Sequence, residues 1–136
     1  MIKPIMKSTL ILSRPARKAS FEDCSVADDL LDTLRAHEDE CVGMAANMIG
    51  KPIAIIVFND QGSYREMFNP EIVEKRGIFE TEEGCLSLLG VRPTKRYKAI
   101  TVNYQNREMK DCKESFSGWT AQIIQHEIDH CKGILI

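Results

Sequence analysis

The stretch "QHEIDH", residues 125–130, sets the architecture expected of this chain, because it places a metal-binding pattern on a helix. Residues four apart lie on one face of a helix, so His126 and His130 can direct imidazole nitrogens at one point, about 2.0–2.1 Å from a metal ion. Glu127 lies beside that point, where the H-E-x-x-H pattern has the general base for a metal-bound water. The stretch predicts a metal centre with hydrolytic chemistry.

The surrounding residues predict a helix over 117–131 whose histidines face inward. Four side chains fall at spacings of four, three and four along one stripe: Trp119, Ile123, His126 and His130. An H-E-x-x-H pattern also arises by chance on amphipathic helices. Two buried imidazoles without a shared partner are costly, however, so their place on the apolar stripe favours a shared metal ion. Gly133 follows the last turn and predicts the end of the helix.

The third metal ligand is expected upstream of this helix. Cys131 lies about 100° around the helix from His130 and points away from the ion, and only Lys132 and uncharged residues follow it. The candidates are the carboxylates and His37, Cys24, Cys41, Cys85 and Cys112. Cys85 stands out because "TEEGCLSLLG", residues 81–90, resembles a loop in which Gly84 lets the backbone approach a site. A Cys–His–His set leaves a fourth position for water, and a thiolate favours iron or zinc over magnesium or calcium.

Elsewhere the pattern predicts one helix followed by sheet. A capping signal at "SVAD" and apolar residues at every fourth position predict a helix over 25–37. The run "PIAIIVFND", residues 52–60, is rich in β-branched residues and ends in turn chemistry at "NDQG", so it predicts a buried strand and a turn. Residues 65–77 and 97–118 predict further strands, the second folded as a hairpin near residues 105–108. We expect a single domain over 1–136.

The composition argues against several classes of protein. A net charge of -2, with no basic cluster beyond short pairs, argues against a nucleic-acid partner. No apolar run has the length of a membrane span, and "MIKPIMKST" lacks the apolar segment of a signal peptide. The cysteines form an odd set of 5 with no CxxC spacing, which predicts reduced thiols rather than a disulfide scaffold. We expect a protein of the cytoplasm with no membrane partner.

Three motifs together resemble the signature motifs of the peptide deformylase family. They are "VGMAANMIG" at 42–50, "EGCLS" at 83–87 and "QHEIDH" at 125–130, in the family's order. The stretches "MIKPI" at 1–5 and "FNPEI" at 68–72 are also similar to the family, so the resemblance covers nearly the whole chain. It implies a compact α+β fold in which antiparallel sheets surround a central metal-binding helix.

The resemblance also implies an activity and roles for the residues of the site. The activity is a metal-dependent hydrolysis that removes the formyl group from N-formylmethionyl peptides of newly made proteins. Cys85, His126 and His130 would hold the metal, with Fe(II) as the physiological ion and Zn(II) or Ni(II) able to replace it. Glu127 would be the base, and the backbone N–H of Leu86 would donate to the developing oxyanion.

Substrate contacts are implied by the same resemblance. They fall on Val42, Gly43, Met44, Met48, Gly84, Arg92 and Ile123. The peptide would lie as an added strand beside residues 42–44, with its methionine side chain between Val42 and Ile123 and its chain held by Arg92. Core packing explains Val42 and Ile123 equally well, as surface solvation explains Arg92. We expect a monomer whose partners are nascent peptides at the ribosome.

Departures from the family pattern concern the first motif and the end of the chain. Met48 stands where the family has a glutamine that donates to the oxyanion, and a thioether cannot donate. Losing one such donor typically costs about 10²–10³ in turnover. Asn47 is adjacent but is expected to point the other way. Cys41 stands where the pattern has glycine, and residues 134–136 are expected to form an edge strand.

These departures leave three functions open. The first is a deformylase with reduced activity, which the complete set of ligands and base favours. The second is a deformylase-like paralogue that binds metal or formyl-peptide without efficient catalysis, as the replacement by Met48 suggests. The third is a hydrolase of another formylated amine. In that case the replacement by Met48, which changes the site where the oxyanion forms, accompanies a change of substrate.

Overall fold

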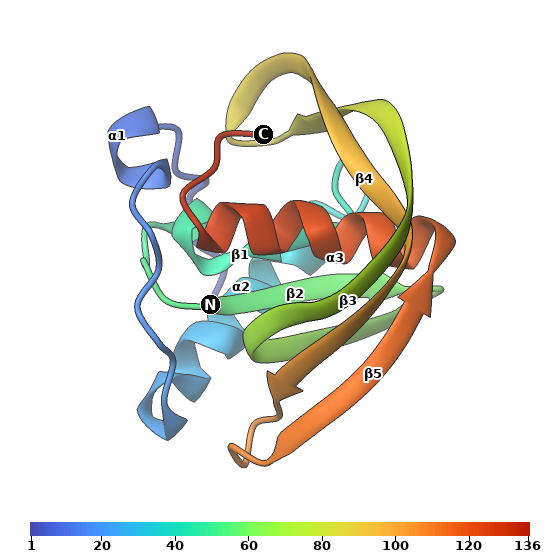
Figure 1. The fold of residues 1–136 in the computed structure, drawn as a ribbon. Helices are drawn as coiled ribbons and strands as arrows, with labels where there is room; N and C mark the ends of the chain where they lie inside the picture. The colour runs from blue at the N-terminus through green and yellow to red at the C-terminus, as the bar shows by residue number, and fades with distance from the viewer.

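The computed structural model describes residues 1–136. One helix crosses the middle of the molecule, and the strands of a single sheet curve around it (Figure 1). In chain order the elements are α1 (Thr9–Leu12), the 3-10 helix η1 (Phe21–Asp23), α2 (Cys24–Ala36), β1 (Gly43–Ala45), the 3-10 helix η2 (Ala46–Ile49), β2 (Ile55–Asp60), β3 (Ser63–Cys85), β4 (Leu88–Gln105), β5 (Asp111–Ser117) and α3 (Gly118–Cys131). None of the helices is both long and apolar enough to span a membrane.

The sheet has 5 strands in the order β1-β2-β3-β4-β5, and every neighbouring pair is antiparallel. The expected α+β class, with antiparallel strands around a central helix, is therefore confirmed. The predicted strand over 52–60 is β2, and it ends in a tight turn at Gln61 and Gly62. The hairpin expected near residues 105–108 joins β4 to β5.

The expected loop at residues 81–90 is wrong, because most of it is strand. Strand β3 continues to Cys85, residues 86 and 87 form a turn, and β4 begins at Leu88. The charged residues here hide the strand pattern in the sequence. Cross-strand partners such as Glu80 and Lys95 supply the pairing that the local residue preferences do not reveal.

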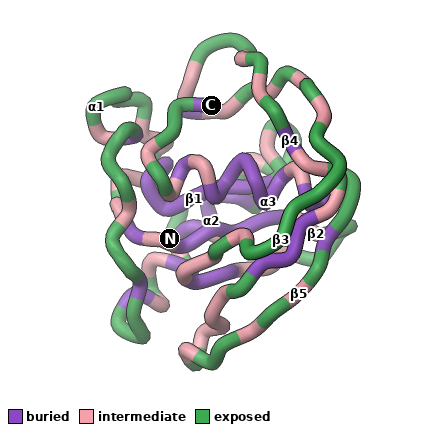
Figure 2. Tube along the Cα trace, in the orientation of Figure 1, coloured by how far each residue is buried: buried purple, intermediate pink, exposed green.

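Helix α3 is buried over most of its length, as its purple trace in Figure 2 shows. Ala121, Ile124 and Ile128 pack into a hydrophobic cluster with residues of the sheet. His126 and His130 are buried as predicted. Trp119, however, is 62% exposed, so its predicted place on the inward stripe is wrong. It lies in the first turn of the helix, where the buried part of the helix has barely begun.

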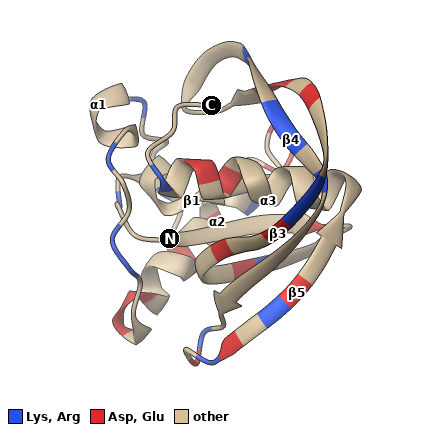
Figure 3. Ribbon diagram, in the orientation of Figure 1, with Lys and Arg blue, Asp and Glu red and all other residues tan.

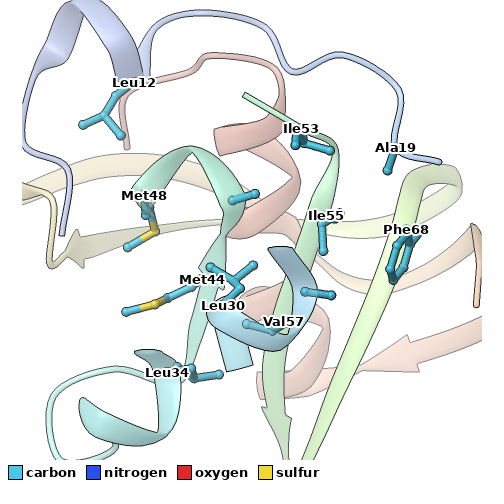
Figure 4. Packing of buried hydrophobic residues seen from close by; sticks show 12 residues of the cluster. Leu12, Ala19, Leu30, Leu34, Met44, Met48, Ile53, Ile55, Val57 and Phe68 are labelled. Carbon is cyan, nitrogen blue, oxygen red and sulfur yellow. The ribbon is translucent and has the colours of Figure 1, made fainter. Parts of the chain in front are cut away.

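A second hydrophobic cluster fills the space between α2, η2 and β2 (Figure 4). Leu30 and Leu34 from α2 pack in it with Met44, Met48 and other apolar residues of the sheet side. Burying each such side chain contributes about 1.5–3 kcal/mol relative to leaving it in water. This cluster supports the segment 43–49 from behind.

The predictions for the end of α3, for the residues after it and for the start of α2 have different outcomes. Gly133 ends α3 with φ +77°, as predicted. Residues 134–136 form no strand, so the expected edge strand is wrong. The predicted cap of α2 at Ser25 is also misplaced, because the capping box pairs Ser20 with Asp23 and η1 leads into the helix.

Candidate metal centre

Three ligand-type side chains meet between the end of β3 and the middle of α3. The Sγ of Cys85 and one ring nitrogen each of His126 and His130 all lie within 4.8 Å of one another. The Nε2 atoms of the two histidines are 3.1 Å apart. Tetrahedral coordination at about 2.0–2.1 Å would place two such nitrogens about 3.4 Å apart. The donor set and its spacing therefore fit a divalent metal ion.

Glu83 fixes the orientation of His126. Its Oε1 lies 2.8 Å from Nδ1 of His126, which leaves Nε2 to face His130. Arg96 and Gln122 also hold the carboxylate. Arg96 donates from Nη2 at 2.7 Å and from Nε to both oxygens at 3.1 Å, and Gln122 donates from Nε2 at 2.8 Å. Arg96 also bonds Asp129 at 2.7 Å. A carboxylate behind a ligating histidine orients the ring and raises its basicity.

Burial and neighbours move the pKa values of the two histidines in opposite directions. For His126, burial opposes the charged form, but hydrogen bonds with Cys85 and Glu83 outweigh it and raise the pKa to about 10. For His130, burial and the neighbouring charge of His126 lower the pKa to about 3. A positive charge therefore lies at the contact of the two Nε2 atoms, which are 3.1 Å apart, and without metal a proton on His126 supplies it. A metal ion supplies that charge without a proton.

Glu127 lies inside the same cleft with its carboxylate fully enclosed. Burial raises the pKa of Glu127 to about 7, close to the range in which a general base works at neutral pH. Its Oε1 has no hydrogen-bond partner in the protein. A Cβ on Gly43 would lie 2.8 Å from Oε2 of Glu127, so only glycine lets β1 approach this carboxylate so closely. Figure 3 shows the acidic positions of α3 at the centre of the molecule.

A cleft of about 840 Å³ opens beside Cys85 and His126. Of the residues implied as substrate contacts, five line it with Leu86: Val42, Gly43, Met48, Gly84 and Ile123. Met44 does not line it, because its side chain is buried in the cluster behind β1. Arg92 does not line it either. Trp119 and Gln122, which were not expected as contacts, line its wall.

Strand β1 forms one edge of the sheet, since it pairs with β2 alone. Its residue Gly43 lines the cleft. An edge strand presents unpaired backbone N–H and C=O groups, which an extended peptide can use by adding as a further strand. The position of β1 therefore agrees with the expectation that a peptide binds beside residues 42–44.

Met48 and Asn47 point in different directions, as expected. Met48 lines the cleft although it is only 1% exposed. The amide of Asn47 is turned away and donates to the backbone carbonyls of Leu12 and His130. The amide of Asn47 therefore does not replace the donor that Met48 lacks.

The sequence contained one unused signal for the residues behind His126. Side chains two apart on a strand lie on the same face, so Glu83 shares the face of Cys85. That spacing identifies Glu83 as a neighbour of the candidate metal centre only once residues 81–85 are recognised as strand rather than loop. Nothing in the local pattern identifies Arg96 or Gln122, which reach Glu83 from β4 and α3.

Comparisons with known proteins agree with this geometry. Residues 3–136 match the family model described as polypeptide deformylase. A curated peptide deformylase from Clostridium beijerinckii is 52% identical over 136 residues, covering 100% of both chains. One from Pseudothermotoga lettingae is 40% identical over 125 residues, covering 90% of this chain and 71% of the relative.

Solved structures give the same result. The peptide deformylase of Thermus thermophilus is 34% identical with a TM-score of 0.88, covering 99% of this chain and 84% of the other. The peptide deformylase of Acinetobacter baumannii with Met-Ala-Ser bound is 28% identical with a TM-score of 0.89, covering 99% and 97%. The chain therefore belongs to the peptide deformylase family and is an enzyme of that class.

Proposed function

We propose that this enzyme removes the formyl group from peptides that begin with N-formylmethionine, using Cys85, His126 and His130 as metal ligands and Glu127 as base. One observation carries the proposal. The three ligand atoms lie within 4.8 Å of one another, at a cleft that Glu127 also lines with its buried, unpartnered Oε1. The relative from Acinetobacter baumannii was solved with Met-Ala-Ser bound, the product that this reaction gives from formyl-Met-Ala-Ser.

The ligand set favours Fe(II) as the resident metal, with Zn(II) and Ni(II) as alternatives. One thiolate and two imidazoles suit these ions better than magnesium or calcium, which prefer oxygen ligands. When bound, the ion supplies Lewis-acid activation of a water molecule and of the formyl oxygen.

The Glu127 side chain then moves one proton, and the backbone stabilises one developing charge. Glu127 accepts a proton from the attacking water, whose oxygen bonds to the formyl carbon. The backbone N–H of Leu86 donates to the formyl oxygen as negative charge develops on it. When the C–N bond breaks, Glu127 delivers the proton to the leaving nitrogen, so formate and a free amine result. A pKa of about 7 for Glu127 suits both steps.

The peptide binds along β1, with its backbone paired to Gly43 and its neighbours. Val42 and Ile123 line the cleft and are the contacts for the methionine side chain. Gly84 borders the cleft from β3. We assign Arg92 to the peptide beyond the cleft, because it does not line the cleft itself. We place the reaction in the cytoplasm, on nascent peptides at the ribosome, with the enzyme as a monomer.

Met48 affects the rate of deformylation that we expect. It lines the cleft with a thioether, which cannot donate a hydrogen bond. We expect deformylation to proceed with the Leu86 N–H as the protein's donor to the oxyanion. The alternative, a paralogue that binds formyl-peptide without efficient catalysis, rests on this same residue.

The test measures formate release from formyl-Met-Ala-Ser by anaerobically iron-loaded protein. We expect turnover by the parent, and turnover raised by about 10²–10³ in the Met48→Gln variant if its amide reaches the oxyanion. Glu127→Ala should abolish turnover while the metal content stays unchanged.

The other outcomes contradict parts of this proposal or favour one of the alternative functions. Formate release by Glu127→Ala at the parent's rate would contradict the assignment of the base. A silent parent with an active Met48→Gln variant would identify a binding paralogue. If both are silent on the peptide, screening other formylated amines tests the remaining alternative.

A further inference from the structure

Asn47 joins three segments of the chain through one side-chain amide. Its Nδ2 donates to the carbonyl of His130 at 2.8 Å and to that of Leu12 at 3.3 Å. Asn47 itself belongs to η2, Leu12 ends α1, and His130 lies in the last turn of α3. The residue is 1% exposed, so water does not compete for these bonds. The amide therefore links the end of α3 to the segment behind the cleft.

Other contacts converge on the same place. The N–H of Met6 donates to the carbonyl of Met48 at 2.7 Å, and the N–H of Ala16 donates to that of Cys131 at 2.8 Å. A Cβ on Gly133 would lie 2.4 Å from the carbonyl oxygen of Ser13, so the chain after α3 also touches the N-terminal segment. Asn47 supplies the side-chain bond in a junction otherwise made by backbone.

The junction bears directly on the metal centre because His130 is part of it. The last carbonyls of a helix lack partners within the helix, and that of His130 accepts from Asn47 and from the N–H of Gly133 at 3.0 Å. The ring of the same residue places Nε2 3.1 Å from that of His126. Metal–ligand distances in a plausible site vary within about 0.2 Å. A small displacement of this helix end therefore moves one ligand out of position.

We propose that Asn47 is a positioning residue for the metal centre, which fixes His130 through its backbone carbonyl. The inference rests on the proposed role of Cys85, His126 and His130 as ligands. It assigns a function to a side chain that points away from the cleft, next to the motif position Met48. Removing the amide donor weakens metal binding and distorts the coordination geometry, although Asn47 touches neither metal nor substrate.

The test compares Asn47→Leu, which keeps much of the volume and removes the donor, with Asn47→Ser, which keeps a smaller donor. Thr33→Val is the matched control. Thr33 is also fully buried, and its hydroxyl accepts from Lys3 N and donates to the Asp29 carbonyl, far along the chain from the metal ligands. Each protein is titrated with Co(II) against a chelator, its absorption spectrum is recorded, and its unfolding in urea is measured.

We expect the Co(II) affinity of Asn47→Leu to fall by about 10-fold or more, in the range for partners behind a ligand. Its Co(II) absorption bands should shift, because they report the ligand geometry. Thr33→Val should lose stability yet keep the affinity and spectrum of the parent. Asn47→Ser should lie between parent and Asn47→Leu.

The inference is overturned if Asn47→Leu loses stability but binds Co(II) with the affinity and spectrum of the parent. A parent that binds no Co(II) contradicts the proposed metal centre instead, so the two failures are distinct. If neither Asn47 variant folds, NMR of the parent decides. The proposal requires that the resonance of the Asn47 side-chain amide differ between metal-free and Zn(II)-loaded protein. An unchanged resonance rejects the proposal.

Discussion

At the scale of single residues, the chemistry of this site depends on where carboxylates are buried. Glu127 has no cation in contact, and burial raises its pKa to about 7. For Glu83, burial acts in the same direction, but bonds from His126 and Arg96 outweigh it and lower the pKa to about 2. Two carboxylates on one cleft thus differ in protonation near neutral pH. Glu127 can exchange a proton, while Glu83 remains charged behind His126.

Replacing Glu83 should weaken the metal centre without changing a ligand. Glu83→Gln keeps the shape of the side chain but removes the charge that Arg96 and His126 share. We expect metal affinity to fall by about 10–100-fold, the usual range for such partners. Chelator competition with Zn(II) measures it. Glu82→Gln, an exposed neighbour, is the control, and equal affinity in both variants would show that Glu83 does not support the ligand.

At the scale of elements, the start of α2 depends on one buried carboxylate. Asp23 accepts two bonds from Arg17, at 2.8 and 3.1 Å, and one from the backbone N–H of Ser20 at 2.8 Å. The bonds from Arg17, followed by burial acting the opposite way and the N–H of Ser20, leave the pKa of Asp23 below its usual value. The charged carboxylate therefore stabilises the folded state.

The pH dependence follows from that direction. A lowered pKa contributes stability above about pH 4, the value for the unfolded chain, and the contribution is lost as the pH falls through the folded value. Asp23→Asn should therefore be less stable than the parent at pH 7, by about 0.2–1 kcal/mol, the range for an ion pair with an exposed partner. The difference should shrink below pH 4 in urea unfolding experiments. A difference that stays constant from pH 7 to pH 3 would show that charge is not the cause.

The end of α3 depends on glycine for two reasons, which two variants separate. Gly133 has φ +77°, and its Cβ would meet the Ser13 carbonyl at 2.4 Å. Gly62 has φ +99° with nothing within 4 Å of a Cβ. Gly62→Ala should cost about 1–2 kcal/mol from backbone strain alone. Gly133→Ala should cost clearly more in the free energy of unfolding, and equal losses would mean that the chain around Ser13 moves aside freely.

At the scale of the whole molecule, the proposed metal ligands join two elements that are far apart in sequence. Cys85 ends β3, whereas His126 and His130 belong to α3. A metal ion that binds only the folded arrangement stabilises it, by about 2.7 kcal/mol when its free concentration is 100 times the dissociation constant. Strand β3 and helix α3 should therefore become more resistant to unfolding together.

This linkage predicts the effect of metal removal. Chelation should lower the melting temperature of the parent, and adding Zn(II) should restore it. Cys85→Ser should melt at nearly the same temperature with and without metal, because a serine hydroxyl is a poor replacement for a thiolate ligand. Cys112→Ser, on β5, serves as control and should keep the full response. A full response in Cys85→Ser would remove this cysteine from the ligand set.

Interactions between residues distant in the sequence account for the features of the fold that local patterns do not predict. The turn-to-turn spacing of His126 and His130 is local, so the sequence was enough to predict a buried pair on a helix. The sequence does not predict the end of β3 and the start of β4, over 77–85 and 88–97, because their stability comes from pairing with each other. Trp119 was misplaced because the helix period does not reveal where the covering sheet ends.

The sequence by itself determined the helix that carries the histidines, the buried strand β2, the hairpin to β5 and, through its motifs, the set of side chains expected at the site. These depend on spacing within short segments and on residue types. Only the tertiary structure decided that Arg96 and Gln122 hold Glu83, that Arg92 lies outside the cleft, and that Asn47 reaches the carbonyl of His130. Those contacts join residues 13 to 83 positions apart, and only strand pairing and the packing of sheet against helix bring them within hydrogen-bonding distance.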